Sequence, residues 1–269
     1  MVITEVDHLS SSDSTSYPTM YAIGQAYEGL LKYNEAYFFY QHCLSMDTTN
    51  IDMLNTLART AINLGKASVA EKYFQRVLDT DTSNFYANYQ LARLYQQLGD
   101  YDKAIEKYNY LLEQDETNFA LQRNIGDCYA RQENWPVAAA YYFSEYNHNR
   151  ENAALASSTI NSMLRLGGPY IEEAITICDT ALYYSPQNRL LHQNKAMALY
   201  MNKEYTKADT IYSSLLAEGD SSYLTVKYGG ASKYYAGFYL PSVDVLELAY
   251  KMDTTSAEVC LLLGSALGK

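Results

Sequence analysis

The chain's 269 residues, of which 48% are hydrophobic and 14% aromatic, supply enough apolar surface for a sizeable buried core. Its formal net charge of −11, from 31 acidic and 20 basic side chains, argues against a general attraction to nucleic acid or to anionic lipid. Five prolines and 13 glycines are too few for a fibrous or disordered chain.

The same order of large and small apolar residues returns every 34 positions. In one copy Leu91 and Ala92 precede a break at Gly99. Ala104 and Tyr108 follow the break at helical spacing. Each copy therefore predicts two short helices joined by a turn at the break. The residues that correspond in the preceding copy are Leu57, Ala58, Gly65, Ala70 and Phe74.

Short polar linkers separate the copies and repeat with them. The segments DTTN, DTSN and DETN occupy residues 47–50, 81–84 and 115–118. Their Asp, Ser, Thr and Asn side chains can accept hydrogen bonds from the free N–H groups of a helix's first turn, so the linkers predict N-caps. The first helices of successive copies are expected to begin at Tyr17, Ile51, Phe85, Phe119, Ala153, Arg189 and Tyr223.

The fifth copy is irregular, and a later one is rich in glycine. The first helix of the fifth copy offers Ala156, Ile160 and Met163, but its turn, LGGPY, carries two extra residues. The segment YGGASKYYAGF at 228–238 holds glycines that are expected to fill the small positions of a helix pair and its turn. A phosphate-binding loop is not indicated, because no strand is predicted before it.

This pattern resembles the tetratricopeptide repeat family, whose helix-turn-helix unit has 34 residues. The resemblance covers about residues 17–269 and implies an all-α fold, a right-handed α-solenoid in which each repeat buries its apolar face against its neighbours. Seven repeats are expected over residues 17–256, and the first helix of a truncated eighth over 257–269. The family's tryptophan near the start of the first helix is absent, and its proline after the second helix survives only as Pro186.

Both ends of the sequence look cut from a longer array. Val2, Val6 and Leu9 are spaced as in a second helix, so residues 1–16 are expected to be the remnant of a preceding second helix and its linker. The alternative is natural frayed ends. No secretory leader is visible at Met1, but a leader or a further domain could lie outside an excerpt.

No constellation of residues favours catalysis, a metal or a cofactor, so the chain is not expected to be an enzyme. The histidines lie in different repeats without metal-ligand spacing. No Cys-x-x-Cys pair occurs, and the four cysteines are expected to be small buried thiols: Cys43, Cys128, Cys178 and Cys260. At least eleven of the 29 tyrosines are expected in core positions: Tyr27, Tyr33, Tyr40, Tyr95, Tyr101, Tyr108, Tyr129, Tyr142, Tyr205, Tyr212 and Tyr239.

The resemblance also implies that the first helix of each repeat lines a concave groove, through its second, fifth, sixth, ninth, twelfth and thirteenth positions. Here these positions carry amides, which can pair with a peptide backbone, and arginines, which can bind carboxylates. Tyrosines add rigid contact area. We expect them to bind a peptide or protein, preferably one with acidic groups, through Asn55, Arg59, Asn63, Tyr86, Tyr89, Gln90, Arg93, Arg123, Asn124, Asp127, Arg131, Asn161, Gln193 and Asn194.

Other roles remain open at this point. The array could be a structural or sensory segment of a larger multidomain signalling protein or enzyme, or a homo-oligomer assembled through Tyr228, Tyr234 and Tyr235. The carboxylate clamp with which some family members bind chaperone tails is not matched, because only Asn124 fits it. No apolar run could span a membrane. The abundance of Tyr and Asn favours a bacterial protein, in the cytoplasm or the periplasm.

Overall fold

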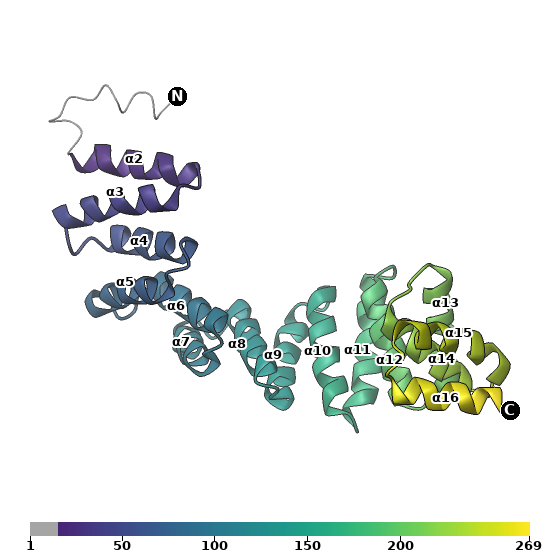
Figure 1. Cartoon of the computed structure of the whole chain (residues 1–269). Helices are drawn as coiled ribbons and strands as arrows, with labels where there is room; N and C mark the ends of the chain where they lie inside the picture. The colour runs from purple at the N-terminus through teal and green to yellow at the C-terminus, as the bar shows by residue number, and fades with distance from the viewer. Residues whose placement is uncertain (1–15) are drawn as a thin grey trace. The chain divides into compact units, whose positions relative to one another are not determined.

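The computed structural model describes residues 16–269, which form α-helices joined by short turns, with no strand in this part of the chain (Figure 1). Within residues 17–114 and within residues 135–267, consecutive helices pack against each other, which confirms the all-α fold of stacked helix pairs. The first helices of the pairs are α2 Tyr17–Gly29, α4 Ile51–Asn63, α6 Phe85–Leu98, α8 Phe119–Arg131, α10 Ala153–Leu166, α12 Arg189–Met201, α14 Tyr223–Tyr235 and α16 Ala257–Leu267. The second helices are α3 Tyr33–Met46, α5 Ala67–Thr80, α7 Tyr101–Gln114, α9 Trp135–His148, α11 Tyr170–Tyr184, α13 Tyr205–Ala217 and α15 Tyr239–Met252.

The chain divides into two compact units, the first ending at Leu121 and the second beginning at Gln122. The first unit contains α2 to α7, and the second contains α9 to α16 with most of α8. The expected remnant of a second helix at 1–16 lies outside the described residues, apart from Ser16, which accepts a hydrogen bond from the Thr19 N–H and caps α2. No helix of residues 16–269 is long and apolar enough to cross a bilayer.

The linkers that end in Asn cap the first helices that follow them, as predicted. Asn50 accepts a hydrogen bond of 2.9 Å from the Met53 N–H at the start of α4. Asn84, Asn152 and Asn188 do the same for α6, α10 and α12. The Asp of a linker instead closes the linker itself, because the carboxylate accepts hydrogen bonds from the residue two positions on. Sequence and geometry therefore repeat together, and they fix where each repeat begins.

A residue with positive φ stands at the turn inside each described pair. Glycine fills this position in four turns, and a positive φ costs glycine no strain. In three other turns Leu31, Glu133 and Lys203 adopt φ values of 59° to 62°, which cost side-chain-bearing residues more. The turns reverse the chain within two or three residues and so bring the two helices of each pair side by side.

In two pairs a glycine of the first helix packs closely against an aromatic ring of the second. In the first unit, a Cβ added to Gly24 would lie 2.5 Å from the Tyr40 ring. In the second unit, a Cβ on Gly126 would lie 2.9 Å from the Tyr142 ring. Both tyrosines are buried. The glycines that follow Tyr228 fill small positions as predicted, since Gly230 is buried and packs against Leu246.

Most core predictions hold, and two are wrong. Cys43, Cys128 and Cys178 are buried, but Cys260 is exposed because α16 turns Val259, Leu262 and Ala266 toward its neighbours instead. Tyr239 is also exposed, since it occupies the first position of α15 and lies at the end of the helix pair. The other ten tyrosines assigned to the core are buried or half-buried.

Candidate functional site

A pocket of about 550 Å³ opens on the first-helix side of the first unit. It brings together three predicted binding residues, Asn55, Arg59 and Tyr86. Residues from α2, α4 and the start of α6 complete its lining, so three consecutive repeats contribute to one hollow. The remaining lining residues are Tyr21, Ile51, Asp52, Thr56 and Asn84.

The polar groups of this pocket differ in whether the chain itself supplies their hydrogen-bond partners. The side-chain oxygen of Asn55 is buried and has no hydrogen-bond partner within residues 16–269, so it can accept a hydrogen bond from a ligand. Arg59 reaches across to Glu28, whose carboxylate oxygens lie 3.0 and 3.2 Å from its Nη2. Glu28 holds the guanidinium in place and partly neutralises it. Arg59 can therefore donate hydrogen bonds in a fixed direction, but it contributes little free positive charge.

The other predicted residues of the first unit do not belong to the lining of this pocket. Arg93 is exposed on α6, and it forms no ion pair with any described residue. Tyr89 is half-buried, and its ring stacks on that of Phe85 at 6.0 Å. Asn63 is exposed and Gln90 is half-buried. Of the two predicted arginines in this unit, Arg93 is therefore the one whose charge no described residue neutralises.

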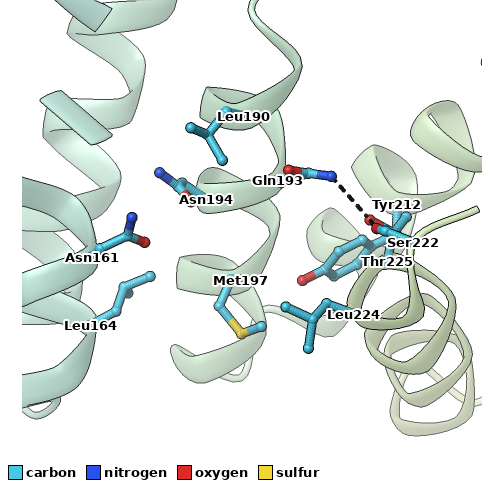
Figure 2. Close-up of a pocket in the computed structure, with 10 residues that line it drawn as sticks. All are labelled: Asn161, Leu164, Leu190, Gln193, Asn194, Met197, Tyr212, Ser222, Leu224 and Thr225. Atoms are coloured by element: carbon cyan, nitrogen blue, oxygen red, sulfur yellow. Dashed lines mark hydrogen bonds between the residues drawn. The ribbon is translucent and has the colours of Figure 1, made fainter. Parts of the chain in front are cut away.

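A second pocket, of about 360 Å³, lies within the second unit between α10, α12 and α14 (Figure 2). Three more predicted residues meet there, Asn161, Gln193 and Asn194. Figure 2 shows Asn161 and Leu164 on one helix facing the side chains of α12, with Gln193 reaching toward α14 on the far side. The remaining lining residues are Leu190, Met197, Tyr212, Ser222, Leu224 and Thr225.

Hydrogen bonds within the chain hold two of the three amides of this second pocket, those of Gln193 and Asn194. The Gln193 amide donates to the Asp220 carboxylate at 2.6 Å and to the Thr225 hydroxyl at 3.5 Å. Asn194 is buried and donates to the Ser157 hydroxyl at 2.6 Å. Burial raises the pKa of Asp220, but hydrogen bonds from Ser222, Gln193 and Thr225 outweigh it and leave this pKa below its ordinary value. Asp220 is therefore charged at neutral pH and keeps Gln193 in position.

Two of the other four predicted residues of the second unit, Arg123 and Asp127, are engaged within the chain. Arg123 donates from Nε to the buried Glu145 at 3.1 Å and makes a second contact through Nη2, so its charge is paired. Asp127 accepts a hydrogen bond of 2.6 Å from the Tyr142 hydroxyl. Arg131 is exposed and Asn124 half-buried. Because Arg59 pairs with Glu28 and Arg123 pairs with Glu145, the predicted sites are less cationic than the sequence suggests.

The sequence pattern overlooked the apolar part of the second pocket. Leu190 and Leu224 are 50% and 60% exposed, and both stand in the second position of a first helix. That position is one of the six expected to face a ligand. The place of these leucines in their helices could therefore have identified them as lining residues. Leu164 had the same signal from the twelfth position of its helix. A single exposed leucine does not by itself indicate a binding site, and it does so only when other apolar residues are known to lie beside it.

The three tyrosines considered for self-assembly belong to a cluster of rings in the second unit. Tyr228 packs on Tyr200 at a centroid distance of 5.1 Å. Tyr235 stacks on Tyr205 at 4.9 Å and also contacts Tyr234. Tyr228 and Tyr234 are half-buried in this cluster, whereas Tyr235 stays 46% exposed.

No described group of acidic, His or Cys side chains is arranged for metal binding, and two buried thiols are poor nucleophiles. Among residues 16–269, no three His, Cys, Asp or Glu side chains lie close enough to hold a metal ion. Burial raises the pKa of both Cys128 and Cys178 to about 12. These thiols are therefore protonated at neutral pH and poor nucleophiles.

Comparison with known proteins agrees with this architecture. Family models of the tetratricopeptide repeat match residues 17–50, 55–119 and 89–154. No curated protein sequence is significantly similar to the chain. A tetratricopeptide repeat protein from Parabacteroides merdae aligns over 93% of this chain and 98% of its own, with 16% identity and a TM-score of 0.61. The C-terminal part of such a protein from Cytophaga hutchinsonii aligns over 90% and 99%, with 14% identity and a TM-score of 0.72.

A third similar structure is YrrB, described as a tetratricopeptide repeat protein with an unusual peptide-binding site. It aligns over 70% of this chain and 95% of its own, with 13% identity and a TM-score of 0.59. At such identities the structures support the fold alone. Together with the matched repeats and the packed helix pairs, they lead to one assignment: the chain belongs to the tetratricopeptide repeat proteins.

Proposed function

We propose that the chain is a non-enzymatic scaffold that binds a peptide or protein partner on the first-helix side of its repeats. Proteins of this family generally bind proteins or peptides and are generally non-catalytic. The observation that carries the proposal is the pocket of the first unit, where the buried oxygen of Asn55 lacks a partner among residues 16–269. An amide acceptor in a hollow lined by tyrosines suits the N–H groups of an extended peptide.

The partner's contact with the first unit is assigned to Asn55, Tyr86 and Arg93. Tyr86 supplies an exposed ring at the pocket, and Arg93 supplies a cation for an acidic group of the partner. Arg59 contributes less than the sequence suggests, because its guanidinium already faces Glu28. A partner segment with an extended backbone and a neighbouring acidic group could contact all three residues at once.

Peptides selected from a random display library against the whole chain test this proposal. The affinity of the best peptide is then measured by calorimetry for the chain and for the triple variant Asn55→Ala, Tyr86→Ala, Arg93→Ala. We expect at least about tenfold weaker binding by the variant, since each lost contact contributes of the order of 1 kcal/mol. The control is Lys72→Ala, which removes an exposed cation from the second helix α5. Failure to select any peptide, or equal binding by the triple variant, rejects the proposal.

A further inference from the structure

The pocket of the second unit differs in chemistry from that of the first. Four aliphatic side chains line it, Leu164, Leu190, Met197 and Leu224. No charged side chain belongs to its lining, whereas the first unit's pocket includes both Asp52 and Arg59. Figure 2 shows Leu164, Met197 and Leu224 along one side of the hollow, below the amides of Asn161 and Gln193.

The size of the hollow suits a side chain. Its volume of about 360 Å³ is far more than one water molecule needs, and it lies near the lower end of the roughly 300–1,000 Å³ typical of ligand pockets. Leu190 and Leu224 keep half or more of their surface exposed at its mouth. Covering such apolar surface is favourable, in proportion to the apolar area removed from water.

The polar rim offers acceptors. Gln193 and Asn194 both use their side-chain N–H groups on partners within the chain, Asp220 and Ser157. Neither amide oxygen accepts a hydrogen bond from another described residue, so both can act as acceptors. An acceptor next to the charged Asp220 favours N–H donors such as those of a peptide backbone, and it disfavours a carboxylate.

We infer that this pocket binds one large aliphatic side chain, such as leucine, from an uncharged stretch of the partner, while Gln193 and Asn194 accept hydrogen bonds from the flanking backbone. The inference rests on the proposed peptide-binding function and assigns a specificity to the second unit. It departs from the acidic partner predicted by the sequence, because the acceptors of the rim repel a carboxylate at this position.

Capped peptides Ac-Ser-Gly-Ser-X-Ser-Gly-Ser-NH2, with X as Leu, Ala, Asp or Lys, test the specificity. Binding is followed by NMR with labelled methionine methyl groups and labelled tyrosine rings in the whole chain. We expect the Leu peptide to shift the Met197 methyl signal and to bind at least tenfold more tightly than the Asp peptide. Binding of the Asp peptide equal to or tighter than that of the Leu peptide overturns the inference.

Two exposed leucines provide a matched pair of variants. Leu224→Ser removes apolar surface from the pocket, and Leu240→Ser removes it from the exposed face of the second helix α15. Leu224→Ser should weaken the Leu peptide at least fivefold, and Leu240→Ser should leave it unchanged. Equal effects of the two substitutions reject the pocket as the site.

The NMR signals separate failure of this inference from failure of the proposed function. A peptide series that shifts the Tyr86 ring signals and leaves Met197 unmoved contradicts the aliphatic pocket while peptide binding by the first unit stands. If no peptide shifts either signal, and display against the whole chain selects none, both proposals fail together.

Discussion

Tyr40 donates a hydrogen bond of 2.8 Å to the carboxylate of Glu28, the same group that receives the guanidinium of Arg59. Tyr40 is fully buried in the second helix α3, whereas Arg59 lies exposed at the pocket of the first unit. A core residue therefore positions a side chain of the candidate binding surface. The third repeat has the same arrangement without the ion pair, because Tyr108 donates to Gln96 at 3.1 Å.

The second repeat lacks this hydrogen bond, and the difference can be tested by substitution. Its equivalent residues are Phe74, which is fully buried, and Ile62. Phe74→Tyr should destabilise the chain by about 1–3 kcal/mol, because it buries a hydroxyl without an acceptor. Adding Ile62→Gln should recover most of that loss. A double-mutant cycle of urea unfolding measures the coupling, and strictly additive effects would contradict the equivalence of the repeats.

Close packing of the first helix pair depends on one of two glycines in α2. Gly24→Ala should cost about 1–3 kcal/mol, since the added Cβ would lie 2.5 Å from a Tyr40 ring that is buried and hydrogen-bonded. The control is Gly29→Ala at the end of the same helix, where no other atom lies within 4 Å of the added Cβ. It should change stability by no more than about 1 kcal/mol. Equal losses at both positions, measured by thermal unfolding, would disprove this account.

The fold was largely predictable because its signals are local and repeat. The Asn of each linker accepts from a backbone N–H three residues on, and the period of 34 places the next helix. The seven predicted first-helix starts coincide with those observed. Cys260 was assigned to the core because its stretch is apolar, but the pattern of α16 does not say which of its faces has a neighbour.

The candidate site was predictable only in part, because the state of each polar group depends on partners distant in sequence. Arg123 pairs with Glu145, 22 residues away on the second helix, and Asn194 bonds to Ser157, 37 residues away. Helix register indicates which face a side chain occupies, but not whether its hydrogen bonds are already used. The first-helix positions therefore indicated some of the residues that line the two pockets, and they overestimated the free positive charge there.

The turns that carry Glu133 and Gly99 should respond in opposite directions to substitution. Glu133 adopts a φ of 59°, where a side chain is strained, so Glu133→Gly should stabilise the chain by up to about 1 kcal/mol. Gly99 has a φ of 80°, and Gly99→Ala should destabilise it by about 1–2 kcal/mol. Urea unfolding of the two variants measures both effects. A loss of stability in Glu133→Gly would show that contacts of the glutamate outweigh the strain.

Asp220 should make the stability of the second unit fall in acid. Its pKa in the folded chain lies below the ordinary value of about 3.9, so its contribution is present above that pH and is lost as the pH falls through the folded pKa. Asp220→Asn should therefore destabilise the chain at pH 7, and the difference from the parent should shrink below about pH 4. The control is Asp244→Asn, at an exposed carboxylate on α15.

The same titration should be visible at the second pocket. Because the charged Asp220 accepts the hydrogen bond of 2.6 Å from Gln193, its protonation should release that amide. The side-chain NH2 signal of Gln193 should then move toward the solvent-exposed range over the pH interval in which stability falls. An amide signal that stays constant through acid unfolding of the second unit would show that Gln193 is held by other contacts, among them Thr225 at 3.5 Å.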